Sequence, residues 1–424
     1  MFVAEKDTMK RSFLQSQFSP KHCFTDVKDI AQETAVDARN NTVVEVPHVQ
    51  MFWAGFSCKS RSRANNSSAK HINCLQRHDA EAETSFTFDA VLGYIQQCKP
   101  TCVILENVRG LLQVTVPGAV SDADYVLGCL NAAGYTCTRF LFDCQETGSP
   151  VARIRLYFVA WLHQGGAASK PGTAADGLRF LEELLGAMTI GGLPASGFIE
   201  PDPATAEDHY DAFDAEVAEP PAKAAKESPA SDHVDFFRKH DVPWPVDLRK
   251  AEEEGDGKGL MFRRTDLPDR AGELLWFLHK AFPRDDALGP SEVEFVDVNC
   301  SIGRLVASEN ESPWKSPGPT IIGSSRMCVR YLHHSHCVVR PLTPLEAFAM
   351  IGFAPAKLRY PVALDARTMR NMAGNAFSGF AFAPMLAVAM TGFGMFCRSG
   401  PQTVLQTIAD APSDNDPGIS EDDV

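Results

Sequence analysis

A single thiol in a polar, basic stretch of the chain is the first candidate for nucleophilic chemistry. Cys58 follows the apolar run Met51 to Phe56, and hydroxyls and cations flank it as far as Arg63. Nearby cations stabilise a thiolate, which is the reactive form of cysteine. Most cysteines are instead small, inert, buried hydrophobes, and that interpretation suits the other eleven better. The pattern predicts a reactive thiol at Cys58, beside cations that could also contact phosphates.

A carboxyl group stands at the end of a second apolar run. Glu106 directly follows Thr101 to Leu105, so a strand there would place it where the sheet meets a cleft. A carboxyl in such a place can donate a proton. The structural alternative is an ion pair with Arg109.

Two arginines alternate on a third predicted strand, Val151 to Val159. Successive strand residues point to opposite faces, so Arg153 and Arg155 are expected on the same face. Together they suit a phosphate or a base edge, and the alternative is a salt-bridged sheet surface.

Two acids follow the first two predicted strands. Glu5 comes after Phe2 to Ala4, and Asp26 after His22 to Phe24. Ligands of open parallel sheets bind outside the carboxyl ends of the strands, where such acids can accept hydrogen bonds from ribose hydroxyls or an adenine amino group. Each acid could instead cap a helix or a turn.

The elements that must position these residues have the order of an α/β fold. Short apolar runs alternate with helical periodicity in the first third of the chain, as βαβ units do. Strands are expected over residues 2–4, 22–24, 49–52, 101–105 and 156–161, and helical spacing is found at 88–95, 178–185, 344–353 and 385–395.

Composition divides the rest of the chain. We predict a catalytic domain over 1–163, a linker with one helix over 164–232, a smaller domain over 233–337, a return to the catalytic domain over 338–397 and a disordered acidic tail over 398–424. Acids in two segments that look disordered, 200–219 and 410–424, supply part of the net charge of −14. A nucleic-acid partner would therefore need a local basic surface.

Other classes of protein fit less well. The 424-residue chain is 44% hydrophobic, has no Cys-x-x-Cys pair and shows no secretory leader, which favours a reducing intracellular compartment. The uncharged stretch Ala376 to Phe396 could suggest a membrane span, but glycines and Pro384 favour a buried helix. The run His333 to Cys337 could suggest a metal, but no second ligand pair stands at a zinc-like spacing.

These segments, in this order, resemble the motifs of the cytosine-5 DNA methyltransferases. Glu106-Asn107-Val108 matches the family's Glu-Asn-Val motif without a change, and Gly55-Phe56-Ser57-Cys58-Lys59-Ser60 is similar to its Gly-Phe-Pro-Cys-Gln-Ser loop. Residues similar to the second, third, eighth, ninth and tenth motifs are Val3 to Asp7, Phe24 to Val27, Gly148 to Arg155, Arg340 to Glu346 with Ile351 to Phe353, and Gly374 to Ala376.

The resemblance implies a Rossmann-like methyltransferase sheet with helices on both faces, plus a smaller target-recognition domain at 233–337. It implies S-adenosylmethionine as cofactor, contacted by Glu5, Asp26, Val27 and Asn375. The implied substrate is duplex DNA with its cytosine flipped out of the helix. No membrane and no metal are expected, and a nuclear or organellar site follows if the substrate is DNA.

The resemblance also gives each catalytic candidate a role. The Cys58 thiolate would add to cytosine C6 while Glu106 protonates N3, which makes C5 nucleophilic. Arg153 and Arg155 would hold the flipped nucleotide. An RNA cytosine-5 methyltransferase, or a non-catalytic nucleic-acid-binding member of the fold, remains an alternative.

Several positions depart from the family pattern. The first motif, a strand with a glycine-rich turn, is expected before Glu5, and the sequence begins at Met1; Thr391 to Gly394 offers a weak permuted replacement. Ser57 stands in place of proline, which predicts a less rigid nucleophile loop, and Lys59 stands in place of glutamine, where it could lower the pKa of the thiol. Val151 stands where the family has the glutamine that braces this loop.

Overall fold

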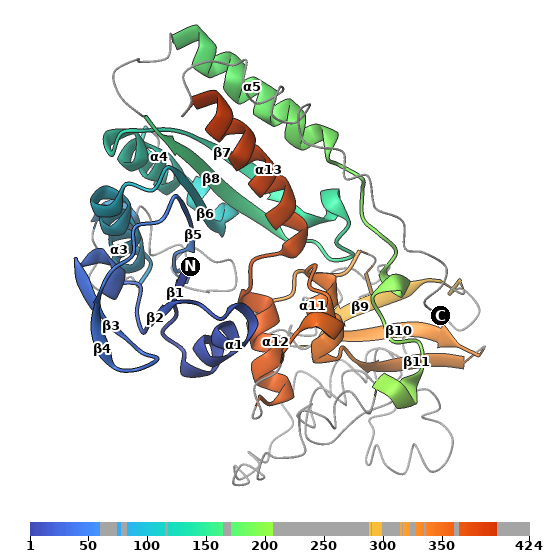
Figure 1. Ribbon diagram of the computed structural model, residues 1–424. Coiled ribbons are helices and arrows are strands. Elements are labelled where there is room, and N and C mark those ends of the chain that lie inside the picture. Colours follow the sequence, from blue (N-terminus) through green and yellow to red (C-terminus); the bar gives the residue numbers. More distant parts are fainter. Residues whose placement is uncertain are drawn as a thin grey trace, which may run out of the picture.

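The computed structural model describes residues 1–59, 74–77, 83–114, 118–163, 171–206, 288–289, 291–298, 314–315, 317–322, 327–334, 336–359 and 364–396. Two sheets within this part carry the candidate site, and a third belongs to a second unit (Figure 1). Most of the smaller domain predicted over 233–337 and the whole acidic tail predicted over 398–424 lie outside the described residues.

The larger sheet has four strands in the order β5-β6-β8-β7. β5 and β6 are parallel, and β8 is antiparallel to both of its neighbours, so the sheet is mixed. The strands are β5 (Met51–Gly55), β6 (Cys102–Val108), β7 (Tyr135–Asp143) and β8 (Ile154–Leu162). Most of β6 and β8 is buried, which explains their continuous apolar runs.

Helices cover both faces of this sheet, as predicted for an α/β methyltransferase fold. One apolar core contains buried residues of β5, β6 and β8 and of α3 and α4. A second lies between the opposite face and the helices α5 and α13 (Figure 1). The helices are α2 (Cys74–Arg77), α3 (Glu83–Cys98), α4 (Asp122–Ala132), α5 (Pro171–Ala187) and α13 (Gly379–Phe396).

A smaller parallel sheet is formed by β1 (Phe2–Ala4) and β2 (His22–Phe24), with α1 (Thr8–Phe18) between them. A hairpin of β3 (Thr34–Asp37) and β4 (Thr42–Glu45) follows the 3-10 turn η1 (Asp29–Ala31). Within the described residues, β1 pairs with β2 and β5 pairs with β6, and the two sheets share no ladder. The ring of Tyr94 on α3 nevertheless contacts Phe2 at 5.6 Å and Phe52 at 4.5 Å between centroids, so β1 and β5 pack on the same helix.

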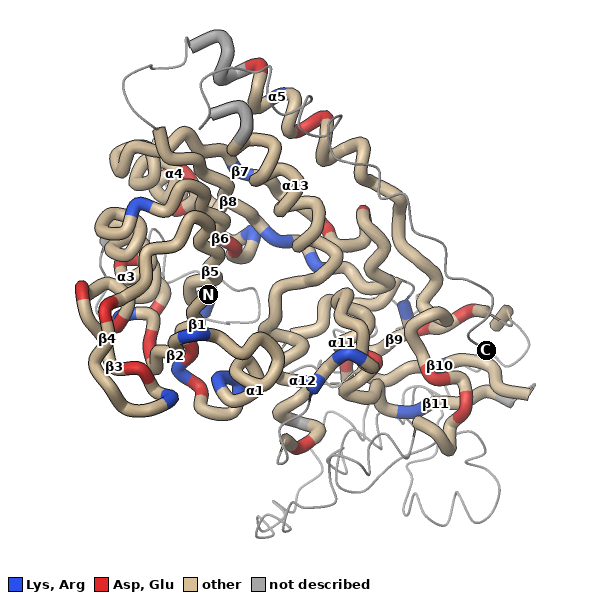
Figure 2. Tube along the Cα trace, viewed as in Figure 1, with Lys and Arg blue, Asp and Glu red and all other residues tan. Residues whose placement is uncertain are grey.

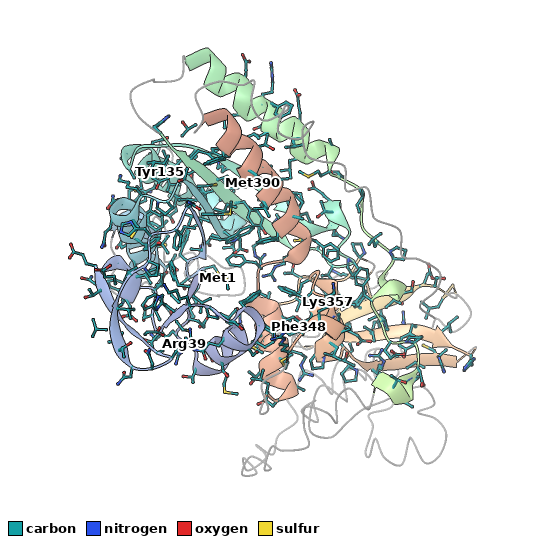
Figure 3. The ribbon with its side chains drawn as sticks, viewed as in Figure 1. Met1, Arg39, Tyr135, Phe348, Lys357 and Met390 are labelled. Atoms are coloured by element: carbon teal, nitrogen blue, oxygen red, sulfur yellow. The ribbon has the colours of Figure 1, made fainter. Side chains whose placement is uncertain are left out.

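The second unit is built on an antiparallel sheet in the order β11-β10-β9. Its strands are β9 (Val293–Asp297), β10 (Met327–His333) and β11 (His336–Pro341), and its helices are α11 (Pro344–Met350) and α12 (Ala366–Asn375), with the 3-10 turn η6 (Pro355–Lys357) between them. One apolar core joins the sheet to both helices and includes Phe13 of α1. The rings of Phe13 and Phe348 lie 5.8 Å apart, and Figure 3 labels Phe348 at this junction.

The predicted domain boundary at residue 337 falls inside β11, because β10 and β11 form a hairpin whose strands cannot be divided between two domains. Within the described residues, α13 makes the return to the larger sheet, while α11 and α12 pack within the second unit. α5 is also more than a linker helix, because its Leu181 and Leu185 are buried against α13 and the sheet. Short 3-10 turns complete the described chain: η3 (Arg109–Leu112), η4 (Cys144–Thr147) and η5 (Ala195–Gly197).

One helical stretch, Thr368–Phe393, is long and apolar enough to cross a membrane by length and composition alone. A single such stretch is weak evidence, because core helices of soluble proteins pass the same test. Here it spans two elements, α12 and α13, and α13 buries Ala381, Met385 and Val388 against the sheet. The described packing thus agrees with the predicted buried helix.

Candidate active site

The loop that carries Cys58 leaves the carboxyl end of β5 and is held at two backbone atoms. The Asn107 side-chain amide donates to the carbonyl of Phe56 at 3.0 Å, and the backbone N–H of Ser57 donates to Thr87 Oγ1 at 2.9 Å. Phe56 itself is buried against Phe88 at 5.1 Å between ring centroids. The expected loss of rigidity at Ser57 is therefore offset, since proline has no N–H to donate to Thr87.

Glu106 lies beside this loop at the end of β6. It is the register partner of Gly55, and Arg155 on β8 is the register partner of Val108. Arg155 Nε lies 3.0 Å from Glu106 Oε1, and both side chains are largely buried. The sequence offered an ion pair between Glu106 and Arg109 as the structural alternative. The structure pairs Glu106 with Arg155 instead. Figure 2 shows acidic and basic positions side by side on β6 and β8.

The electrostatics of Cys58 differ from the sequence prediction. Burial raises the pKa of the Cys58 thiol, the negative charge of Glu106 raises it further, and the cations Arg155 and Arg153 lower it only in part. Lys59 does not compensate, because its Nζ pairs with Glu83 at 2.6 Å on the exposed side of the loop. The prediction of a thiolate-favouring setting was wrong for the described residues, because burial outweighs the nearby cations.

Arg153 does not stand where the sequence predicted it. β8 begins at Ile154, one residue later, and the Arg153 side chain is 3% exposed. Its guanidinium donates to the carbonyls of Ile321 at 2.9 Å, Gly374 at 3.1 Å and Ala376 at 2.6 Å. The expectation that Arg153 holds a flipped nucleotide is therefore corrected, since its terminal nitrogens are occupied by backbone.

The acids expected to bind the cofactor lie at the ends of adjacent strands. Glu5 follows β1 and donates its backbone N–H to the carbonyl of Phe24 at 3.1 Å, and Asp26 follows β2. One oxygen of each carboxylate accepts a local backbone N–H, from Asp7 at 2.9 Å and Lys28 at 3.0 Å. Within the described residues their second oxygens have no partner, so both acids fit the hydroxyl and amino donors of a nucleoside.

The other two residues expected at the cofactor are placed differently. Val27 is half-buried and packs against the core under the larger sheet. Asn375 is exposed at the end of α12, where its amide donates to the carbonyl of Asn371 at 2.9 Å. The permuted replacement proposed at Thr391 to Gly394 lies inside α13, and a side chain at Gly392 would overlap the ring of Trp161. That segment is therefore a packing site and not a glycine-rich turn.

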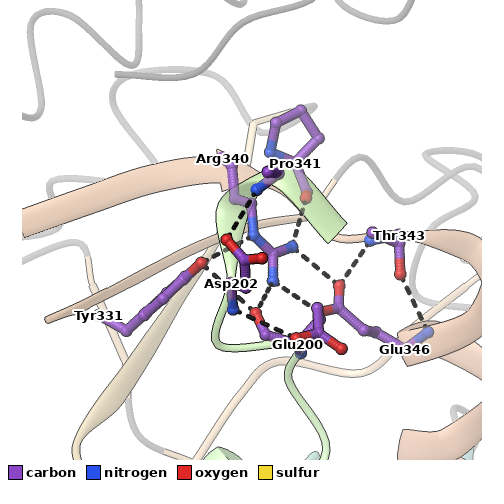
Figure 4. Close-up of polar contacts among 8 residues, drawn as sticks. Glu200, Asp202, Tyr331, Arg340, Pro341, Thr343 and Glu346 are labelled. Carbon is purple, nitrogen blue, oxygen red and sulfur yellow. Dashed lines mark hydrogen bonds and ion pairs between the residues drawn. The ribbon is translucent and has the colours of Figure 1, made fainter. Parts of the chain in front are cut away.

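The ninth-motif segment forms a buried polar cluster that the sequence did not predict (Figure 4). Arg340 donates to both carboxylate oxygens of Glu346, at 2.9 and 2.6 Å, to the hydroxyl of Tyr331 at 3.1 Å and to the carbonyl of Glu200 at 2.8 Å. Thr343 caps α11 reciprocally with Glu346.

Burial alone would lower the pKa of Arg340, but the Glu346 carboxylate raises it overall. The backbone N–H of Glu200 also donates to Glu346, at 2.7 Å. The start of the acidic segment predicted to be disordered is thus fixed to the second unit, and residues 207–219 lie outside the described part.

Among the described residues, no group of three His, Cys, Asp or Glu side chains comes together as a metal site. In the hairpin, His333 is the register partner of His336, and Cys337 is buried.

Comparisons with known proteins relate the first part of the chain to cytosine-5 methylases. Residues 1–176 match the model of the C-5 cytosine-specific DNA methylase family. The chain is 30% identical over 161 residues to a DNA (cytosine-5-)-methyltransferase of Cryptococcus neoformans var. grubii. These 161 residues are 38% of this chain, and the match covers 6% of that protein.

Solved structures are matched more loosely. The chain is similar to the S. pombe Dnmt2 methyltransferase at 11% identity and to the Entamoeba histolytica methyltransferase EhMeth at 10%, each with 92% of this chain and 90% of the other covered. Both TM-scores are 0.43, too low for these likenesses to say anything of substrate. The family match and the curated relative both point to residues 1–176, which are similar to C-5 cytosine-specific DNA methylases, and the chain spans only 6% of the length of that relative.

Proposed function

We propose that this chain transfers a methyl group from S-adenosylmethionine to C5 of cytosine in DNA, through a covalent adduct at Cys58. The observation that carries the proposal is the meeting of Cys58, Glu106 and Arg155 at the ends of β5, β6 and β8, within the residues that match the C-5 cytosine-specific DNA methylase model. Cytosine C5 is too weak a nucleophile to take a methyl group unaided, so the site must activate it.

Activation begins at the thiol. The Cys58 thiol first loses its proton to solvent, and the thiolate then adds to C6 of the flipped base and forms a C–S bond, while the Glu106 carboxyl donates a proton to N3. The electron pair displaced from the 5,6 double bond makes C5 nucleophilic. Arg155 holds Oε1 of Glu106, and Oε2 faces Gly55 beside the loop of Cys58. Arg155 thereby orients the carboxyl group for this proton transfer.

S-adenosylmethionine, when bound, supplies an electrophilic methyl group to C5. Glu5 and Asp26 would hold its adenosine part, because their free carboxylate oxygens accept hydrogen bonds from hydroxyl and amino groups. After methylation a base takes the C5 proton, the C6–S bond breaks with departure of the Cys58 thiolate, and N3 returns its proton to Glu106, which restores the 5,6 double bond. The target base must be flipped out of the duplex to reach the thiol.

RNA is the second candidate substrate. A methyl-transfer assay separates the two, with labelled S-adenosylmethionine offered to duplex DNA and to a folded RNA of the same sequence. Label in DNA that is lost in Cys58→Ser and kept in Cys129→Ser supports the proposal. If only the RNA is labelled, the chain is an RNA methyltransferase. If neither nucleic acid is labelled, the proposal that the chain is an active methyltransferase is contradicted.

A further inference from the structure

Arg153 joins three parts of the chain that are far apart in sequence. It precedes β8, and its guanidinium donates to a carbonyl in the 317–322 segment and to two carbonyls at the C-terminal end of α12, those of Gly374 in its last turn and Ala376 at its cap. The backbone of the same region pairs with the first of these segments, since Ala152 N–H donates to Gly318 at 3.0 Å and Gly318 N–H donates to Pro150 at 3.2 Å. Arg153 therefore lies at the junction of both units.

The turn that Arg153 holds carries an aromatic ring into the candidate active site. Phe377 follows Ala376 directly, and a side chain at Gly55 would stand 3.1 Å from Phe377 Cζ and 3.5 Å from Glu106 Oε2. The ring is therefore packed on the end of β5, beside the Glu106 carboxyl. Trp53 supports it from the same strand, with ring centroids 5.5 Å apart in an edge-on arrangement.

We propose that Arg153 is a positioning residue: by holding the carbonyls of Gly374 and Ala376 it keeps Phe377 against Gly55 and closes the wall of the pocket at Glu106 and Cys58. The role deepens the proposed function and rests on it only for the chemistry at Cys58. Phe377 excludes water from this wall, and Arg153 acts through Phe377 and touches no reacting atom.

The chemistry of the guanidinium suits this role better than a simple charge does. Its planar fork donates in fixed directions from two terminal nitrogens, here to three carbonyls in two segments. A lysine ammonium keeps the charge and loses the fork. Lysine at this position should therefore preserve the local electrostatics while releasing the turn.

The test is the pH profile of Cys58 alkylation by iodoacetamide, followed on the Cys58 peptide in the whole chain. This readout needs no methyl transfer, so it stays informative if the proposed function fails. Arg153→Lys and Phe377→Ala are each expected to shift the profile to lower pH and to raise the rate at fixed pH several-fold, because water enters the pocket. The double variant should shift no further than either single variant.

Two controls separate positioning from general destabilisation. Arg139→Lys changes an arginine of a more exposed ion pair with Asp124, and Leu130→Ala weakens the core under α4. Both should leave the profile unchanged. The proposal is overturned if Arg153→Lys keeps the wild-type profile, or if it shifts while Phe377→Ala does not. Phe377 is only half-buried, so its variant decides the question even where Arg153→Lys fails to fold.

Discussion

Arg155 Nε lies 3.0 Å from Glu106 Oε1, and the negative charge of Glu106 and the cation of Arg155 both act on the Cys58 thiol. The pair joins β8 to the end of β6 and leaves Glu106 Oε2 beside Gly55. Arg155 therefore orients the carboxyl group of Glu106. Arg153, two residues earlier, instead binds the backbone carbonyls of Ile321, Gly374 and Ala376.

Replacing Arg155 should therefore impair methyl transfer more than folding. Arg155→Ala is expected to lower kcat about 10²- to 10³-fold, the typical loss when one oriented electrostatic contact is removed from an active site. Arg155→Lys should recover only part of the rate, because an ammonium cannot reproduce the planar contact. Steady-state methyl transfer measures both variants, and a wild-type kcat for Arg155→Ala would contradict the assignment.

The raised pKa of Cys58 predicts alkaline activation of the thiol. Burial and Glu106 favour the neutral form, so the rate of Cys58 alkylation should keep rising at pH values above the ordinary thiol pKa of about 8.5. Glu106→Gln removes the nearby negative charge and should shift this rise to lower pH. Mass-spectrometric alkylation kinetics give the profile, and a plateau below pH 7 would show that the thiol is activated after all.

The half-buried thiol of Cys137 also predicts how stability depends on pH. Burial raises the pKa of Cys137 to about 12, so the folded state holds the proton of this thiol more tightly than the unfolded state does. Its contribution is fully present below the unfolded pKa of about 8.5 and is lost as the pH rises toward 12. Urea unfolding should give a free energy that falls between pH 8.5 and pH 11. Cys137→Ser should flatten that fall, and an unchanged slope in this variant would contradict the explanation.

The buried cluster around Arg340 predicts a large loss of stability. Glu346→Ala leaves the guanidinium without its carboxylate in the core, which typically costs about 3 to 5 kcal/mol in the free energy of unfolding. Asp176→Ala is the matched control, because its partner Arg179 is exposed and such surface pairs contribute about 0 to 1 kcal/mol. Chemical denaturation compares the two, and equal losses would show that the cluster is not a stabilising feature.

The unpaired strand edges predict uneven hydrogen exchange. Within the described residues β1 and β5 each have one ladder partner, while β6 lies between β5 and β8. Amides of β1 and β5 should exchange faster than those of β6, because amides without a ladder partner are less protected. Exchange followed by mass spectrometry resolves these peptides. Equal protection of β1, β5 and β6 would mean that the free edges are covered by another strand.

The sequence predicted three strands of the larger sheet, and β6 and β8 stood out because they are largely buried and appear as apolar runs. It missed β7, whose burial is interrupted along its length. It also predicted that Cys58 and Glu106 lie at strand ends on one edge. It could not predict the roles of the two arginines. Arg153 and Arg155 look equivalent by alternation, and only the carbonyls of Ile321, Gly374 and Ala376, far away in the chain, separate them.

The pKa of Cys58 was predicted wrongly for a related reason. Local sequence shows the cations that flank a thiol but not how deeply the fold buries it, and here Lys59 turns to Glu83. The Arg340 cluster was missed because its acceptors come from Glu200 and Glu346, on separate segments. Phe377 carries no sequence signal beyond its place after the tenth motif.

The most direct test of the account is to trap the covalent intermediate. The chain is incubated with S-adenosylmethionine and a duplex in which the target base is 5-fluorocytosine, since fluorine cannot leave C5 as a proton does. The account predicts an adduct that survives denaturation, requires the cofactor, and is absent in Cys58→Ala but present in Cys129→Ala. A chain that binds the duplex and the cofactor but forms no adduct at Cys58 would contradict it.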